Sequence, residues 1–333
     1  MHYRRLGPSN LQVSALCLGT MMFGDQTEAA EAARIVDQAH AAGVNFIDTA
    51  DVYTLGASET MVGTLIKATR NDWVLATKLG NKLSARPNEG HYSRVWITRE
   101  VQASLQRLQT GHIDILYLHR DFADMNLEEP LRAIDDLIRA GQLRHWGLSN
   151  FRGWRIAEMV HLARQIGMPG PVVCQPYYNL LNRMPEVEIV PACQHHGIGV
   201  VPYSPIARGV LTGKYTPGAP PDPASRAGRG DKRMLETEFR PESLAIAQRL
   251  QEHAQAKGCT LAQFATAWVL ANKAVSSVIA GPRTLQQWLD YGPALDCTLD
   301  AADEALVDSL VPPGHPSTPG YTDPAYPLVG RLV

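Results

Sequence analysis

Residues 73–119 open with the run Trp73-Val74-Leu75-Ala76-Thr77-Lys78 and close with Ile113-Asp114-Ile115-Leu116-Tyr117-Leu118-His119. Each run is short and mainly apolar, which is typical of a buried strand. Between the two runs, residues 98–108 carry apolar side chains at helical spacing, and Thr98 offers a capping hydroxyl ahead of an acidic first turn. A strand, a helix and a second strand in this order predict a βαβ unit with parallel strands.

The same alternation continues outward in both directions along almost the whole chain. Gly43 and Gly141 follow two apolar helical stretches, as glycines that end helices do. The predicted strands are 13–19, 45–49, 73–78, 113–119, 143–149, 172–176, 199–203 and 276–281, and the predicted helices include 29–42, 58–69, 98–108, 127–140 and 154–166.

Eight parallel strands, each followed by a helix, predict an α/β protein with the (β/α)8 or TIM barrel fold. The alternative is a doubly wound open sheet, which carries a Gly-x-Gly-x-x-Gly phosphate loop after its first strand. The first predicted strand leads into Leu18-Gly19-Thr20-Met21-Met22-Phe23-Gly24, which lacks that spacing. The nearest match, Gly197-Ile198-Gly199, precedes a strand instead of following one. The barrel is therefore favoured.

Three parts exceed a minimal barrel. These are an N-terminal hairpin, a long loop over residues 206–240 after the seventh strand, and a tail over 311–333 that contains six prolines. We expect a single barrel domain over residues 1–310, with 311–333 as a proline-rich C-terminal tail. The tail is expected either to wrap over the barrel or to be disordered.

The composition restricts the possible function classes. With 31 basic and 33 acidic side chains, the formal net charge is −2, which leaves no surplus of positive charge for nucleic acid or an anionic membrane. No signal peptide follows Met1 and no run of roughly 18 apolar residues occurs, so we expect a cytoplasmic protein. The 5 cysteines never form Cys-x-x-Cys, and His195-His196 lacks a third ligand at metal spacing, so no metal site is expected.

Ionisable residues follow three neighbouring predicted strands, where the active sites of such barrels lie. Asp48 ends the second strand, Lys78 the third and His119 the fourth, while Tyr53 comes shortly after Asp48. Taken singly, each is as consistent with a cap or a surface ion pair. Together they form a consistent catalytic group. A tyrosine has a pKa of ~10, so it donates a proton readily at neutral pH only when a neighbouring cation lowers that pKa. Lys78 would be that cation, held by Asp48.

This pattern resembles the aldo-keto reductase family, over roughly residues 3–310. Asp48, Tyr53, Lys78 and His119 match the family's catalytic tetrad. Further matches follow strands five to eight: Gly147-Leu148-Ser149-Asn150, Cys174-Gln175-Pro176-Tyr177, Tyr203-Ser204-Pro205, Leu211-Thr212-Gly213-Lys214-Tyr215 and Gly281-Pro282-Arg283-Thr284. The resemblance implies an oxidoreductase that reduces an aldehyde or ketone by hydride transfer from NADPH. In it Tyr53 gives the proton and His119 orients the carbonyl.

The resemblance also implies a nicotinamide cofactor that lies extended across the top of the barrel. Ser149, Asn150 and Gln175 would hydrogen-bond its carboxamide, and Tyr203 would stack on the ring. Arg283 would meet the adenosine 2′-phosphate, which favours NADP(H) over NAD(H). The implied cofactor contacts are Gly19, Thr20, Asp48, Ser149, Asn150, Gln175, Tyr203, Ser204, Pro205, Ile206, Arg208, Gly209, Leu211, Lys214, Gly281, Arg283, Gln287 and Asp290.

Several alternatives about the cofactor and substrate regions stay open. The basic loop 206–240 either folds over the cofactor pyrophosphate or is solvated. Tyr291 stands where the family usually has an asparagine at the adenine, which points to stacking in place of a hydrogen bond. Four residues near the rim either line a substrate pocket or pack loops onto the barrel: Met22, Phe23, Trp96 and Phe122.

Two other functions compete with carbonyl reduction. One is a cofactor-sensing regulatory subunit with little turnover, because some members of the family are attached to membrane channels. The other is an alcohol or sugar dehydrogenase that prefers NAD(H). A small-molecule carbonyl compound is the expected partner, and the sequence leaves open whether the chain forms a homo-oligomer.

Overall fold

The computed structural model describes residues 1–327 of the 333. These residues group into two compact units. The first unit contains Met1–Pro176, Glu188–Tyr203 and Lys273–Gly292, and the second contains Tyr177–Val187, Ser204–Asn272 and the residues from Pro293 onward. The division into one domain over 1–310 and a tail over 311–333 stays a prediction.

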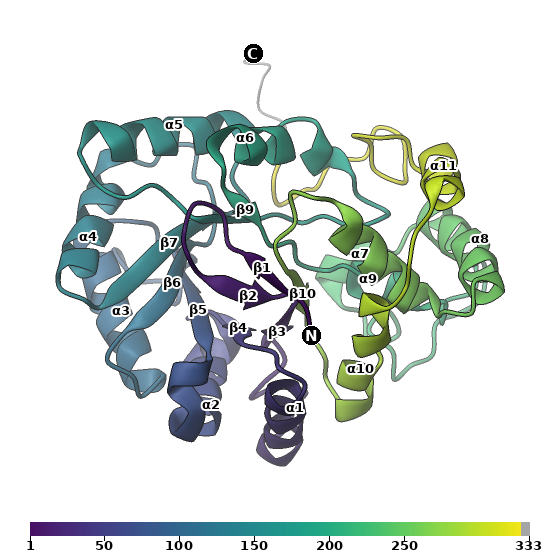
Figure 1. The fold of residues 1–333 in the computed structure, drawn as a ribbon, viewed down its shortest axis with the longest axis horizontal. Helices are drawn as coiled ribbons and strands as arrows, with labels where there is room; N and C mark the ends of the chain where they lie inside the picture. Colours follow the sequence, from purple (N-terminus) through teal and green to yellow (C-terminus); the bar gives the residue numbers. More distant parts are fainter. Residues whose placement is uncertain (328–333) are drawn as a thin grey trace. The chain divides into compact units, whose positions relative to one another are not determined.

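The first unit is built on an eight-stranded parallel sheet in the order β10-β3-β4-β5-β6-β7-β8-β9 (Figure 1). The edge strands β9 and β10 are joined in turn by a parallel bridge between Val200 and Val275, and the Ile279 N–H donates to Pro202 O at 3.0 Å. The predicted barrel is thereby confirmed. The strands are β3 (Leu16–Gly19), β4 (Phe46–Asp48), β5 (Val74–Leu79), β6 (Ile113–Leu118), β7 (Leu143–Ser149), β8 (Val173–Gln175), β9 (Gly199–Val200) and β10 (Val278–Ala280).

The predicted N-terminal hairpin is present, and it packs against the amino ends of β8 and β9. Its strands β1 (Tyr3–Arg5) and β2 (Gln12–Ser14) pair antiparallel, so the predicted strand 13–19 is in fact the end of this hairpin followed by β3. Gly7 has φ +52°, and a Cβ there would lie 2.1 Å from the carbonyl oxygen of Val172. Only glycine therefore lets the hairpin approach the barrel this closely.

Helices surround the sheet of the first unit on its outer side (Figure 1). Gly43 and Gly141 have φ of +80° and +74° just past helix ends, as predicted. The predicted helix 58–69 is divided into an α-helix and a 3-10 helix. The helices are α1 (Ala29–Ala41), η1 (Tyr53–Gly56), α2 (Ala57–Leu65), η2 (Lys67–Asp72), α3 (Arg94–Arg107), α4 (Glu128–Arg139), α5 (Gly153–Gln165), α6 (Ile189–His196) and α10 (Leu285–Leu289).

The predicted start of helix α3 was wrong. Ser93 is the N-cap, and its hydroxyl accepts from the Trp96 N–H at 3.2 Å. Thr98 lies inside the helix and its hydroxyl donates to Arg94 O at 2.9 Å. The helix begins earlier because Trp96 and Ile97 are buried and extend its apolar face by one turn.

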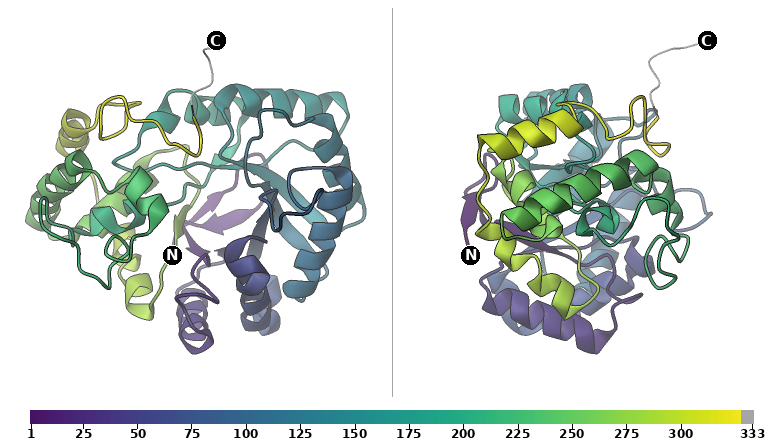
Figure 2. Two further views of the ribbon diagram at one scale, coloured as in Figure 1. Left: turned by 180° about the vertical axis from the view of Figure 1, so that it is seen from behind. Right: turned by 90° about the vertical axis from the view of Figure 1, so that its right-hand side faces the viewer.

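The second unit is mainly helical. Its longest helix, α8, lies beside α11 (Figure 2). His253 Nε2 on α8 is 2.6 Å from Asp303 Oδ1 on α11. The predicted loop 206–240 holds a 3-10 helix and a short α-helix. The helices of this unit are η3 (Met184–Glu186), η4 (Ala207–Thr212), α7 (Lys232–Thr237), α8 (Pro241–Ala256), α9 (Leu261–Ala271) and α11 (Ala301–Leu310), and η5 (Gly292–Leu295) starts at its boundary.

The proline-rich tail is ordered along its described part and lies on the second unit. The Ser317 N–H donates to Leu181 O at 2.8 Å, and Arg240 Nε donates to the Thr318 hydroxyl at 2.7 Å. Arg233 and Asp323 form an ion pair. Residues 311–327 therefore pack on helices and loops of their own unit, which is neither the expected wrap over the barrel nor disorder, and residues 328–333 lie outside the described part.

Candidate active site

Three neighbouring strands bring the predicted tetrad together at the carboxyl end of the barrel. Asp48 ends β4, Lys78 lies near the end of β5, and His119 follows β6, while Tyr53 starts η1. Lys78 Nζ donates to Asp48 Oδ1, and it lies 3.1 Å from Tyr53 Oη. The His119 ring stands edge-on to the Tyr53 ring, with centroids 6.1 Å apart. Four residues far apart in sequence thus share one site.

Burial and charge set the protonation state of Lys78. Its side chain has no exposed area, and Asp48 is 2% exposed. Burial alone favours a neutral amine, but the charge of Asp48 and the hydrogen bonds to Asp48 and Tyr53 outweigh it and raise the pKa of Lys78 above its ordinary value. The Thr49 carbonyl accepts a further hydrogen bond from Nζ at 2.8 Å. Lys78 is therefore a fixed cation beside the phenol at neutral pH.

His119 is neutral at the same site. Burial, and then the charge of Lys78, lower the pKa of His119 well below its ordinary value. Its Nδ1 atom is buried and, among the described residues, has no hydrogen-bond partner. A neutral imidazole is a hydrogen-bond donor that does not compete with Lys78 as a cation.

Polar side chains from the next two strands adjoin the tetrad. Gln175, at the end of β8, donates from Nε2 to Asp48 Oδ2 at 3.0 Å. The Ser149 hydroxyl, at the end of β7, donates to Gln175 O at 3.0 Å. Both side chains are buried, and both come from positions predicted to hold the nicotinamide carboxamide.

Asn150 connects the tetrad to Tyr203. Its Nδ2 donates to His119 O at 3.0 Å, and its Oδ1 accepts from Tyr203 Oη at 2.8 Å. The backbone of Asn150 has φ +61°, a conformation that asparagine tolerates better than most residues. The orientation of the amide is therefore fixed before any ligand binds.

Comparison with known proteins identifies the family of this chain. The family model described as the aldo/keto reductase family matches residues 15–312. The chain belongs to this family. Membership supports oxidoreductase activity on carbonyl compounds and the binding of a nicotinamide cofactor as a class.

Individual relatives cover nearly the whole chain. A probable voltage-gated potassium channel subunit beta from Arabidopsis thaliana is 37% identical over 303 residues, which are 89% of this chain and 92% of that protein. A protein of the same description from rice is 36% identical over 303 residues, which again cover 89% of this chain and 92% of the relative. An uncharacterized oxidoreductase, YrpG, from Bacillus subtilis is 34% identical over 335 residues, covering 96% of this chain and 99% of the relative.

In this aldo/keto reductase, the end of the first barrel strand, β3, packs against the strand that carries Asp48. The Thr20 hydroxyl contacts Asp48 O at 3.0 Å and the Ser58 hydroxyl at 3.0 Å, and Thr20 has no exposed area. A Cβ on Gly19 would lie 2.6 Å from Ile279 Cγ2. Both predicted contact residues thus hold neighbouring strand ends in place.

The segment after β10 contains four of the predicted cofactor-binding residues: Gly281, Arg283, Gln287 and Asp290. The Arg283 N–H donates to Gln287 Oε1 at 2.9 Å, and Arg283 Nη1 donates to Gln26 Oε1 at 3.3 Å. Asp290 accepts from Gln286 at 2.9 Å. Tyr291 is only 6% exposed, so its buried ring argues against the expected stacking on an adenine.

The remaining predicted cofactor residues lie on one segment of the second unit. Arg208 Nε is 3.0 Å from Glu238 Oε2, and Glu238 has no exposed area. A Cβ on Gly209 would lie 3.1 Å from Lys214 Nζ, so the ammonium group folds back over η4. The segment contains Ser204, Pro205, Ile206, Arg208, Gly209, Leu211 and Lys214.

The proposed substrate-pocket residues differ in their exposure. Phe23 has no exposed area and Trp96 is 2% exposed, so burial favours the packing alternative for these two. Met22 and Phe122 are partly exposed. Phe122 stacks on His91, with ring centroids 4.0 Å apart.

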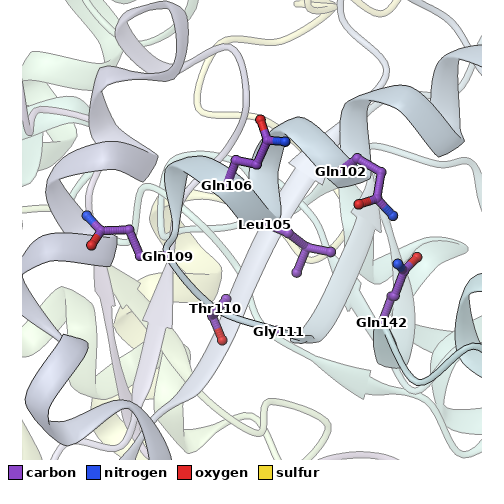
Figure 3. Close-up of a pocket in the computed structure, with 7 residues that line it drawn as sticks. All are labelled: Gln102, Leu105, Gln106, Gln109, Thr110, Gly111 and Gln142. Atoms are coloured by element: carbon purple, nitrogen blue, oxygen red, sulfur yellow. The ribbon is translucent and has the colours of Figure 1, made fainter.

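A surface pocket of about 410 Å³ lies away from this site (Figure 3). It lies beside the end of α3 and the loops that precede β6 and β7, at the amino ends of the strands. None of its lining residues is ionisable, so it offers no acid, base or anion-binding cation. They are Gln102, Leu105, Gln106, Gln109, Thr110, Gly111 and Gln142.

Neither metal ligands nor membrane spans are found in the part of the chain that the structure describes. Within residues 1–327, no three His, Cys, Asp or Glu side chains gather as a metal ion would require. Over the same residues, every helix is too short or too polar to cross a bilayer.

Sequence reasoning missed a group of charged residues next to Tyr53. Asp51, Glu59 and Glu100 are buried, and Arg107 binds two of them. The one available signal was the seven-residue spacing of Glu100 and Arg107, which places both on one face of a helix.

Proposed function

We propose that this chain reduces an aldehyde or ketone to the alcohol, reversibly, with NADP(H) as cofactor and Tyr53 as proton donor. One observation carries the proposal: a buried Lys78 ammonium lies between Asp48 and Tyr53 Oη. The proposal also takes the protein to be cytoplasmic and its substrate to be a small carbonyl compound.

Each member of the tetrad has a separate task in this proposal. Bound NADPH would supply a hydride to the carbonyl carbon. Tyr53 gives its proton to the carbonyl oxygen, and the Lys78 cation stabilises the phenolate that is left. Asp48 keeps Lys78 in place and balances its charge. The neutral His119 donates a hydrogen bond that orients the carbonyl.

The polar residues beside the tetrad fit a nicotinamide carboxamide, which offers both donors and acceptors. Ser149, Asn150 and Gln175 carry hydroxyl and amide groups at adjoining strand ends. Tyr203 is partly exposed and its hydroxyl is held by Asn150, which suits an aromatic surface for the ring. Arg283 is partly exposed and is our candidate for the 2′-phosphate of NADP(H).

The test is a turnover assay with purified protein. NADPH and NADH are each mixed with a panel of small aldehydes and ketones, and nicotinamide absorbance is followed. We expect oxidation of NADPH that depends on the carbonyl compound, and slower oxidation of NADH. Faster turnover with NADH than with NADPH would instead favour the NAD-preferring dehydrogenase.

A second candidate function is a cofactor-sensing regulatory subunit. It is favoured by the 37% and 36% identity to two plant proteins described as probable potassium channel beta subunits. The same assay separates the two functions. Tight NADPH binding, seen by quenching of tryptophan fluorescence, without turnover of any carbonyl compound would favour the regulatory subunit.

A further inference from the structure

Four ionisable side chains behind η1 take no part in the proposed chemistry. Asp51 and Glu59 have no exposed area and Glu100 is 4% exposed. Arg107 reaches them from the end of α3: its Nε donates to Glu59 Oε2 at 2.6 Å and its Nη2 donates to Glu100. Buried charges cost stability unless they are paired, so an apolar contact would join these helices at lower cost. Stability alone therefore does not explain why these ionisable residues are buried here.

The turn that carries Tyr53 is strained. Thr54 and Leu55 have φ of 48° and 52°, and Gly56 has φ of 90°. Residues with a side chain seldom adopt the left-handed region, and two in succession persist only when the surroundings hold them. The position of the phenol thus depends on what packs against the turn.

Arg107 packs against the end of this turn. A Cβ on Gly56 would lie 2.7 Å from Arg107 Cδ, so the arginine side chain lies directly on the glycine. Helix α2 begins at the next residue, and Glu59 in its first turn holds the guanidinium. Any movement of the turn that carries Tyr53 toward Arg107 is blocked.

Glu59 connects the same contact to Lys78. Its second oxygen, Oε1, accepts from the Thr77 hydroxyl at 2.5 Å, and Thr77 directly precedes Lys78 on β5. A single buried carboxylate therefore holds both the strand of the ammonium and, through Arg107, the turn of the phenol. The Asp51 N–H adds a backbone link to Lys78 O at 3.1 Å.

We propose that Glu59 and Arg107 are positioning residues that keep Tyr53 Oη within hydrogen-bond distance of Lys78 Nζ. Neither side chain touches the reacting atoms, so each acts through the turn and the strand. The effect on turnover rests on the proposed function, whereas the effect on the turn does not. A misplacement of about 1 Å is enough to slow an enzyme by roughly a hundredfold.

The first measurement is hydrogen exchange of the turn, which needs no activity. In Arg107→Met, we expect the amides of residues 50–56 to exchange about tenfold faster or more, while those of β6 keep their rate. Arg107→Lys should restore part of the protection, because a lysine still pairs with Glu59. The matched control is Arg70→Met, which removes a partly buried arginine that binds Asp114 at 2.7 Å, at the amino end of β6.

The second measurement is the split between kcat and KM. In Arg107→Met we expect kcat to fall about tenfold or more with KM for NADPH within about twofold, because only the phenol is misplaced. Thr77→Val removes the hydroxyl that binds Glu59 and should act in the same direction, whereas Thr77→Ser keeps that hydroxyl and should retain kcat. These threonine variants also cover the case in which Arg107→Met fails to fold.

Three results would overturn the proposal. They are unchanged exchange of residues 50–56 in Arg107→Met, an equal loss of kcat in Arg70→Met, and full kcat in Thr77→Val. If the wild-type chain turns over no carbonyl compound, the proposed function fails and the exchange measurement alone decides the role of Arg107.

Discussion

At the scale of single residues, position and contact were predictable to different degrees. Asp48, Lys78 and His119 could be placed together from sequence because each lies at or just past the carboxyl end of a barrel strand, and parallel strands end on one rim. The pairing of Arg208 with the buried Glu238 could not, because it joins residues thirty positions apart through packing that has no periodic signal. The same holds for the burial of Tyr291.

Arg283→Ala tests the proposed origin of cofactor preference. If the guanidinium meets the 2′-phosphate, its loss should weaken NADPH binding by roughly tenfold or more, because charge-assisted hydrogen bonds contribute about 1.5–3 kcal/mol. Binding of NADH should change little. Fluorescence titration with both cofactors measures the difference, and equal losses would assign Arg283 another role.

Asp51→Asn tests the buried carboxyl behind the turn that carries Tyr53. Burial, and then Glu59 and Glu100, raise the pKa of Asp51 well above its ordinary value, so the folded protein binds this proton more tightly than the unfolded chain. The resulting stability is complete below the ordinary pKa of about 3.9 and is lost as pH rises toward the folded pKa.

Asn cannot ionise, so the variant should be more stable than wild type at pH 8, and its advantage should shrink toward pH 4. Thermal unfolding midpoints across this range measure the effect. An advantage that stays constant with pH would contradict the assignment.

At the scale of elements, sequence periodicity located the strands well and the helix starts less well. The error at α3 arose because both Ser93 and Thr98 offer a capping hydroxyl, and only the burial of Trp96 distinguishes them. The hairpin and β3 were merged because Val13 and Leu16 are both buried and apolar, so the break at Ala15 leaves no trace in hydropathy.

Gly7→Ala tests the contact of the hairpin with the barrel. An added Cβ would meet Val172 O at 2.1 Å and would also occupy a positive φ. We expect a loss of about 2 kcal/mol or more in the free energy of unfolding. Gly167→Ala is the matched control, because Gly167 also has a positive φ, +75°, and nothing lies within 4 Å of its added Cβ. A similar stability change in both variants would refute the close contact.

At the scale of the whole molecule, the order of strands was predictable and the grouping of the chain was not. Eight alternating units leave little choice other than a closed barrel once the phosphate loop of the open sheet is missing. The course of the tail depends on long-range contacts such as Ser317 to Leu181. Its prolines indicate a lack of regular structure and do not indicate where the segment binds.

The proposed reaction depends on the phenol held by Lys78, and Tyr53→Phe removes that phenol. This change removes one oxygen and keeps the ring, so NADPH affinity should stay within about twofold of wild type while kcat for carbonyl reduction falls by about 10² to 10⁴-fold. Steady-state turnover and fluorescence titration on the same preparation give both values. Undiminished turnover in Tyr53→Phe would contradict the assignment of Tyr53 as the proton donor.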